Sequence, residues 1–171
     1  MYFYQTMKSP LGTLRLIADE DSLVALYTKE DLEIDARSPL KNMALKSLKH
    51  TVLLQAKKEL DDYFLGKRKH FTVPLKPHGT VFQNKAWSAL LKIPYGDIWS
   101  YGKQAQFLKK PKAQRAVGCA NGKNPIPIII PCHRVIGSSG KLTGYSGGME
   151  MKIFLLRHEG HKLDTHGLKV I

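Results

Sequence analysis

The chain has 171 residues, 43% of them hydrophobic, and its 27 lysines and arginines against 14 aspartates and glutamates give a formal net charge of +13. This composition excludes a disordered chain, and no apolar stretch approaches the ~20 residues that a membrane-spanning helix needs. The N-terminus also lacks the apolar segment of a secretory signal, so we expect a cytoplasmic protein that uses no membrane partner and keeps its two cysteines as free thiols.

The positive charge is concentrated in the second half of the chain. Residues 1–78 carry 13 basic and 10 acidic side chains, a net charge of +3, whereas residues 79–171 carry 14 and 4, a net charge of +10. This half is therefore the part expected to bind a polyanion such as nucleic acid, and the alternative is a charged surface that only keeps the protein soluble.

Residues 1–78 are predicted to form a small α/β domain. Three apolar runs, YFYQTMK, TLRLIA and SLVALYT, are separated by the turn-forming SPLG and DED and predict a three-stranded antiparallel sheet. The acidic segment KEDLEIDARSPL predicts a loop. Apolar residues at helical spacing, Leu45 and Leu48 among them, predict a helix from Met43 to Leu65 that Gly66 ends. This half holds no cluster of catalytic type, so we predict a scaffold.

The segment PLKPHG marks a predicted domain boundary near residue 78, and three helices are predicted after it. Thr80 and Gln83 form a capping-box pattern before an amphipathic helix that IPYG ends. Ser100 is a suitable N-cap for the segment YGKQAQFL, and KAQRAVGCA continues to a stop at Asn121 and Gly122. The last two helices predict a helix-turn-helix, a motif that places one helix in a nucleic-acid groove.

The second helix of this motif carries unusually few long side chains on its surface. Its surface carries the small residues Ala113, Ala116, Gly118 and Cys119, and Arg115 is its only long cation. Such a helix can approach the minor groove, which is only ~6 Å wide, and contact backbone and sugar. Tight packing inside the protein explains the same composition equally well.

The segment IPCHRV places Cys132 beside His133 and Arg134 at the end of the most apolar run of the chain. A buried cysteine is often an inert small hydrophobe. Glu159, however, lies in the segment MEMKIFLLRHEG, which is predicted to form a helix that Gly160 ends. Glu159 therefore falls at a helix C-terminus, where the dipole disfavours a carboxylate by roughly 0.3–1 kcal/mol. An imidazole partner would compensate, and Glu159 orienting His133 would let His133 take the proton of Cys132, directly or through a water, to give a nucleophilic thiolate.

The motifs PCHRV, NPIPIII, SSGKLTGYSGG and LLRHEG together closely resemble those of the O6-alkylguanine-DNA alkyltransferases, which are direct-reversal repair proteins. The resemblance covers the second half from FQNKAW to HEGHKL and, more loosely, the first half. It implies that Cys132 accepts the alkyl group, that His133 and Glu159 form its activating relay, and that Asn124 braces the active-site turn.

The resemblance also implies how DNA is bound. Arg115 would enter the base stack where the damaged nucleotide has left, and Tyr101 would push on the neighbouring phosphate. The other helix positions expected at the DNA are Ala113, Ala116 and Asn121.

A pocket for the extruded base follows from the same resemblance. Tyr145 would offer its hydroxyl to ring nitrogen N3, and Ser146 its main-chain amide to O6. The carbonyls of Cys132 and Val135 would accept from the guanine amino group, and Ser138 would lie in the pocket loop. Thr143 also belongs to the pocket, at a position that varies in the family, as Asn121 does on the helix, so the tolerated alkyl size stays open.

The family implies a ribonuclease-H-like α/β domain over residues 1–78, with a small antiparallel sheet and a helix, and a mostly α-helical winged-helix domain over residues 79–171 that binds DNA and accepts the alkyl group. We expect a monomer that binds double-stranded DNA containing alkylated bases. Some members of the family bind zinc through N-terminal cysteines and histidines. No cysteine precedes Cys119 in this chain, so we predict no metal, and the sequence offers no cofactor site.

Three other classes of protein remain possible from the sequence. A non-catalytic relative that only binds alkylated lesions would need no thiol, and a winged-helix transcription factor would need a helix that reads bases. A cysteine hydrolase would turn over repeatedly on a substrate other than DNA. Preference for O4-alkylthymine does not follow from the sequence.

Overall fold

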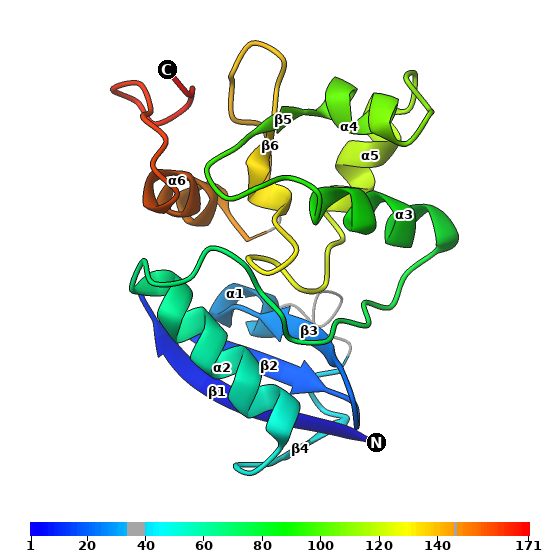
Figure 1. The fold of residues 1–171 in the computed structure, drawn as a ribbon, viewed down its shortest axis with the longest axis vertical. Helices are drawn as coiled ribbons and strands as arrows, with labels where there is room; N and C mark the ends of the chain where they lie inside the picture. Colours follow the sequence, from blue (N-terminus) through cyan, green and yellow to red (C-terminus); the bar gives the residue numbers. More distant parts are fainter. Residues whose placement is uncertain (34–39, 146) are drawn as a thin grey trace. The chain divides into compact units, whose positions relative to one another are not determined.

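The structure is a computed structural model, and it describes residues 1–33, 40–145 and 147–171. The chain divides into two compact units, Met1–His78 and Gly79–Ile171, whose elements are drawn in Figure 1. In the described ranges, no helix has both the length and the apolar character needed to cross a bilayer.

The first unit is built on a four-stranded sheet in the order β3-β2-β1-β4. Strands β1 (Tyr2–Ser9), β2 (Gly12–Ala18) and β3 (Leu23–Tyr27) pair antiparallel, which confirms the predicted three-stranded sheet. A short fourth strand, β4 (Ala44–Lys46), pairs parallel with β1 and was not predicted. The sheet is therefore mixed at one edge.

Helix α2 (Thr51–Phe64) starts later than predicted. The expected start at Met43 was wrong because β4 occupies Ala44–Lys46, and the side chains of Leu45 and Leu48 are 59% and 70% exposed. The helical spacing of Leu45 and Leu48 therefore does not mark the buried face of a helix. The C-terminal end was predicted correctly, since Gly66 has a φ of 71°, a conformation that glycine adopts without strain.

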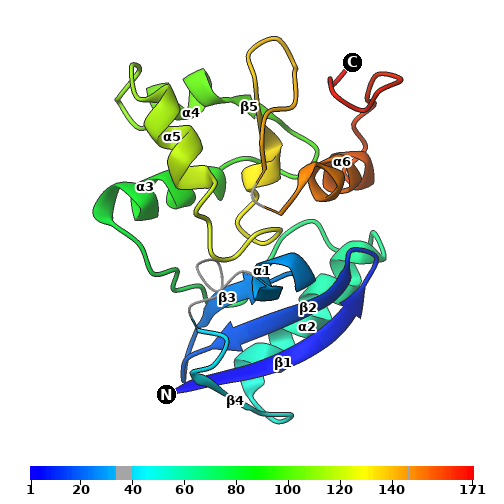
Figure 2. The same cartoon turned by 180° about the vertical axis from the view of Figure 1, so that it is seen from behind.

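One face of the sheet is covered by α2, as the opposite views in Figures 1 and 2 show. Its inward side chains include Val52, Leu53, Ala56, Leu60 and Tyr63. Because the spacing of these residues matches the helical period, burying them against the sheet holds α2 in place.

The predicted loop after β3 begins with a short helix, α1 (Lys29–Glu33). Thr28 and Asp31 explain it, because the Thr28 hydroxyl accepts a hydrogen bond from the amide of Asp31 at 3.2 Å while the Asp31 carboxylate accepts from the amide of Thr28 at 2.9 Å. This reciprocal pair caps the first turn. Residues 34–39 of the predicted loop lie outside the described residues.

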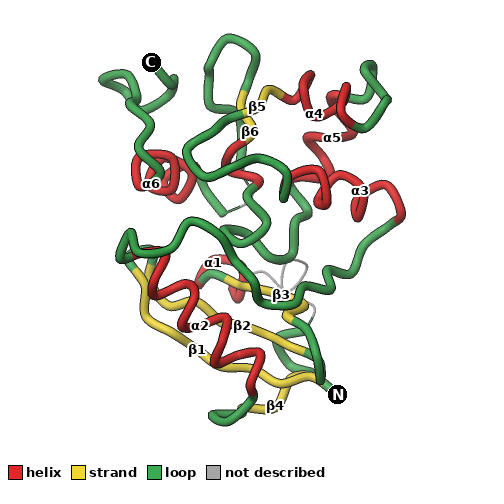
Figure 3. Tube along the Cα trace, in the orientation of Figure 1, coloured by secondary structure: helices red, strands yellow, loops and turns green. Residues whose placement is uncertain are grey.

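In the second unit, helices α3 (Val81–Leu90), α4 (Tyr101–Phe107) and α5 (Gln114–Asn121) occupy the predicted segments (Figure 3). The capping box of Thr80 and Gln83 is present, and the Ser100 hydroxyl accepts from the amide of Lys103 at 3.0 Å. Both predicted helix starts are therefore confirmed.

Buried polar bonds fasten these three helices together. The indole of Trp87 on α3 donates to the carbonyl of Ala120 on α5 at 2.8 Å. Gln104 of α4 donates to the carbonyl of Ala86 at 3.1 Å, and its side-chain amide exchanges two hydrogen bonds with that of Asn121, at 2.8 and 3.1 Å. The buried polar side chains of Trp87, Gln104 and Asn121 are thus all hydrogen-bonded, and their bonds join the three helices.

The remaining elements place the cysteine segment beside α4. Strand β5 (Trp99–Ser100) leads directly into α4 and pairs parallel with β6 (Val135–Ile136), which follows the 3₁₀ turn Cys132–Arg134. Helix α6 (Met149–His158) completes the unit. The start of the helix-turn-helix and the cysteine turn are thus joined through two adjacent strands.

Candidate active site

Cys132 lies in a buried turn that the side-chain amide of Asn124 stabilises. The side-chain amide of Asn124 donates to the carbonyl of Ile130 at 2.7 Å and to the sulfur of Cys132 at 3.1 Å, and its oxygen accepts from the amide of Ile126 at 3.0 Å. The structure thus brings Asn124 to the position that the sequence analysis expected. Ile128 has a φ of 73°, which strains a β-branched residue by roughly 1–3 kcal/mol.

His133 and Glu159 meet although 26 residues separate them in the sequence. Nε2 of His133 lies 2.9 Å from Oε1 of Glu159, and both side chains are buried. Glu159 is the residue that follows the last turn of α6, as predicted. The expected pairing of an imidazole with this carboxylate is therefore present.

Arg134 forms hydrogen bonds with both oxygens of the same carboxylate. Its Nε donates to Oε2 of Glu159 at 2.8 Å, one terminal nitrogen donates to Oε1 at 2.9 Å, and the other donates to the carbonyl of Ile93 at 2.6 Å. The guanidinium is thus committed to Glu159 in a bidentate pair.

The electrostatics of this trio fix the state of the imidazole. Burial acts to raise the pKa of Glu159, but its hydrogen bond and charge interaction with His133 and those with Arg134 hold the pKa well below the usual range, so the carboxylate is ionised. Burial lowers the pKa of His133, against the opposing effect of Glu159, so the resting imidazole is neutral near pH 7. A neutral His133 that pairs with an ionised carboxylate donates from Nε2, which leaves a lone pair on Nδ1.

Nδ1 of His133 is buried and has no hydrogen-bond partner among the described protein atoms. It can therefore accept a proton. Burial raises the pKa of the Cys132 thiol, while hydrogen bonds from Asn124 and Tyr145 and the charge of Lys152 act in the opposite direction. Because burial dominates, the resting sulfur is a thiol, and a base is needed to create the thiolate.

Lys152 is a site residue that the sequence analysis missed. It lies on α6, and its ammonium donates to the carbonyl of Val135 at 2.7 Å and to that of Thr143 at 3.3 Å. A lysine one helical turn before Leu156, on the buried face of the predicted helix, was the available signal. Val135 was expected to offer this carbonyl to the base, and a carbonyl has a second lone pair to do so.

A small cavity of about 10 Å³ opens beside the cysteine. It is lined by Tyr101, Gly118, Asn121, Gly122, Cys132, Gly144, Tyr145 and Lys152. At its edge the hydroxyl of Thr143 donates to that of Tyr101 at 3.0 Å. The structure thus places Tyr101 and Tyr145, predicted for separate contacts, in one cavity with Cys132, while Thr143 is exposed and contacts Tyr101.

Helix α5 presents its bare surface to solvent. Arg115, Ala116 and Cys119 are exposed, and Ala113 is half-buried at the N-cap. Asn121 was expected on this surface, and the structure corrects that expectation, since its amide is buried in the pair with Gln104.

Two predicted pocket residues, Ser138 and Ser146, are not among the described residues that line the cavity. Ser138 is exposed in a turn closed by a hydrogen bond from the amide of Gly140 to the carbonyl of Gly137, and it is not among the residues that line the cavity. Ser146 lies outside the described residues.

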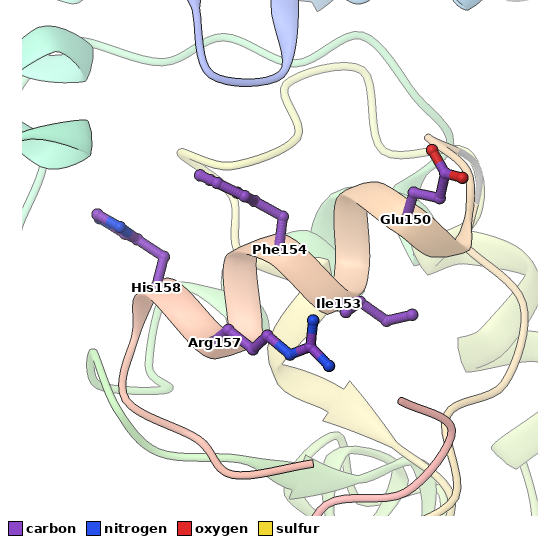
Figure 4. Close-up of a pocket in the computed structure, with 5 residues that line it drawn as sticks. All are labelled: Glu150, Ile153, Phe154, Arg157 and His158. Atoms are coloured by element: carbon purple, nitrogen blue, oxygen red, sulfur yellow. The ribbon is translucent and has the colours of Figure 1, made fainter. Parts of the chain in front are cut away.

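A larger hollow of about 510 Å³ lies along α6, away from the predicted site residues. Figure 4 shows that Glu150, Ile153, Phe154, Arg157 and His158 all project from this one helix. The rings of Phe154 and His158 stack with centroids 5.9 Å apart. None of the residues that line this hollow was predicted as a site residue, whereas the small cavity contains Cys132.

Comparison with known protein families accounts for both units. A model described as the DNA-binding domain of 6-O-methylguanine DNA methyltransferase matches residues 81–161, and one described as the ribonuclease-like domain of the same protein matches residues 2–77. The chain belongs to the 6-O-methylguanine DNA methyltransferase family. Membership confirms the fold class expected from the sequence, a ribonuclease-like α/β part followed by a helical DNA-binding part.

Several members of this family resemble the chain over almost its whole length. The constitutive methylated-DNA–protein-cysteine methyltransferase of Bacillus subtilis is 44% identical over 160 residues, which is 93% of this chain and 96% of that protein. The enzyme of Methanosarcina mazei is 45% identical over 161 residues, 94% of this chain and 99% of that one. A crystal structure of the Mycobacterium tuberculosis protein in complex with DNA superimposes with a TM-score of 0.83, at 43% identity and 92% coverage of each chain.

Proposed function

We propose that this protein repairs DNA by direct reversal, transferring the alkyl group of an O6-alkylguanine to Cys132 once per molecule. The observation that carries the proposal is the buried Cys132, held by Asn124 and followed in the chain by a neutral His133 whose Nε2 is committed to Glu159. Such an arrangement supplies both the nucleophile and the base for alkyl transfer. Family membership and the near full-length relatives support the same activity.

The proposed chemistry begins with proton transfer from the Cys132 sulfur to Nδ1 of His133, directly or through one water. The thiolate then attacks the alkyl carbon, a carbon–sulfur bond forms, and the carbon–oxygen bond breaks with its electron pair on the guanine. The guanine anion takes up the proton that the imidazole holds. Glu159 and Arg134 keep the imidazole oriented throughout, because Glu159 forms one hydrogen bond with His133 and two with Arg134.

The product explains why a single event is proposed. A thioether has no carbonyl or phosphoryl centre for water to attack, so no route regenerates the thiol. The protein is then a stoichiometric reagent, in contrast to a cysteine hydrolase, whose acyl-enzyme intermediate hydrolyses.

DNA binding is assigned to residues 79–171 and a scaffold role to residues 1–78. Helix α5 exposes Arg115 and Gln114 beside the small residues Ala116 and Cys119, and the second unit carries most of the excess positive charge. A buried thiol cannot reach a stacked base, so the nucleotide must be extruded at a cost of a few kcal/mol. Arg115 filling the vacated stack, with Tyr101 near the backbone, would offset part of that cost. We expect the protein to act as a monomer, with O4-alkylthymine as a second substrate to be tested.

The test is the stoichiometry of transfer. With duplex DNA carrying O6-methylguanine in excess, intact-mass measurement should show one methyl group per chain, located on the peptide that contains Cys132. Cys119→Ser is the matched control, because Cys119 is an exposed thiol on α5 and should be dispensable. Cys132→Ala should bind the duplex like the parent and gain no mass.

The outcomes separate the alternatives. Product formation well beyond one equivalent with Cys132 unmodified would identify a hydrolase or another catalyst. Binding without mass gain in the parent protein would identify a non-catalytic lesion-binding protein, and binding without lesion preference a winged-helix DNA-binding protein.

A further inference from the structure

Lys152 is a buried cation that the proposed chemistry does not use. Lys152 is 1% exposed, and its ammonium donates to the neutral carbonyls of Val135 and Thr143, at 2.7 and 3.3 Å. Among residues 1–33, 40–145 and 147–171, no carboxylate oxygen lies within 4.0 Å of its ammonium. Burying an ammonium without an anion is costly, and such groups occur where function uses the charge.

The groups that face Lys152 come from three elements. The cysteine turn contributes Cys132 and His133, whose pKa values the lysine charge acts to lower. The segment before α6 contributes Tyr145, whose ring centroid lies 5.9 Å from the ammonium, and α4 contributes Tyr101 across the cavity. Of these, Cys132 is the group that becomes an anion when the proposed reaction starts.

The carboxylate of Glu159 binds His133 and Arg134, and among the described residues the ammonium of Lys152 forms its hydrogen bonds with backbone carbonyls and forms no ion pair with Glu159. Two carbonyls hold the ammonium instead, one directly after the cysteine turn and one in the segment before α6. Their positions are fixed by the backbone, so the charge is placed before the reaction begins.

We propose that Lys152 is a positioning residue whose buried ammonium, held by these two carbonyls, supplies the positive charge that balances the Cys132 thiolate. This proposal rests on the proposed function of Cys132. The thiol proton goes to His133, and Lys152 keeps its own proton. When the carbon–sulfur bond forms, the negative charge moves to the departing guanine, and it disappears when the guanine is protonated.

The charge is present at neutral pH. Burial lowers the pKa of Lys152 to about 8, against an opposing effect of Cys132, so the ammonium persists below that pH and is lost above it. A purely structural lysine would hold the two carbonyls but would leave the ionisation of Cys132 unchanged.

The experiment titrates the thiol in the Cys119→Ser background, where Cys132 is the only thiol, by the ultraviolet absorbance of the thiolate. Lys152→Met should raise the pKa of Cys132 by about one unit, and since one unit changes the thiolate fraction about tenfold, transfer at pH 7 should slow by a similar factor. Lys152→Arg keeps the charge and should restore most of both. A folded Lys152→Met variant with an unchanged Cys132 pKa would overturn the proposal.

A second measurement needs no substitution at Lys152. The side-chain carbon next to its amine is titrated by NMR before and after Cys132 is methylated with iodomethane in the Cys119→Ser protein. The pKa of Lys152 should fall, because a thioether cannot become an anion; an unchanged pKa would contradict the proposal. Neither titration uses DNA, so a failure of transfer from DNA in the parent protein would refute the proposed function separately.

Discussion

Replacing Arg134 with leucine should destabilise the second unit strongly. Arg134 and Glu159 are 6% and 5% exposed, and the substitution removes two hydrogen bonds to the carboxylate and one to the carbonyl of Ile93. Removing one partner of a buried ion pair costs roughly 3–5 kcal/mol, since the other charge stays buried. We expect a loss of this size in the free energy of unfolding, measured by urea denaturation at pH 7.

The pH dependence tests the cause. In the parent, the pKa of Glu159 is held low, so the stability it contributes is present above about pH 4.5 and is lost as the pH falls. Without Arg134 that pKa rises, the buried charge is neutralised more easily, and the difference between parent and variant should shrink at pH 4.5. In a Glu159→Gln background, Arg134→Leu should cost at least ~1 kcal/mol less than in the parent.

A loss below about 1 kcal/mol at pH 7, or the same loss in both backgrounds, would refute this reasoning. Transfer to Cys132 should also slow in Arg134→Leu, because the carboxylate that orients His133 loses its second support.

Three further predictions follow from the same contacts. Arg115→Ala should slow repair of duplex DNA far more than reaction with free alkylated guanine; equal slowing of both would mean that Arg115 shapes the pocket. Because burial lowers the pKa of His133, the unfolded chain binds a proton below about pH 6.5 that the folded chain resists, so the free energy of unfolding should fall from pH 7 to 5.5 and His133→Gln should flatten this slope. Thr80→Ala should lower the free energy of unfolding by about 1 kcal/mol through loss of the cap of α3, whereas Thr165→Ala, at an exposed turn position outside any helix cap, should not.

Local signals predicted the helices of the second unit well. The capping box at Thr80 and the N-cap at Ser100 are decided by residues three positions apart, so the sequence contains all the information needed. The pairing of His133 with Glu159 was also accessible, because a carboxylate at a helix C-terminus requires a compensating partner.

Long-range contacts escaped prediction. Strand β4 exists because Ala44–Lys46 pairs with β1, more than 40 residues away, and that pairing overrides the helical spacing of Leu45. Asn121 is buried since Gln104, on another helix, satisfies its amide. The same holds for Lys152, whose carbonyl partners lie 17 and 9 residues away and carry no side-chain signal.

The cavity beside Cys132, with its volume of about 10 Å³, has room for little more than one water molecule, whereas pockets that hold small molecules measure hundreds of cubic ångströms. For a nucleobase to enter here, as proposed, the walls of the cavity must separate. The apparent affinity for a lesion is lowered in proportion to the fraction of open molecules. The small cavity also slows, without preventing, the reaction of the sulfur with soluble electrophiles and oxidants, so an acceptor that can be used only once is spared from most side reactions.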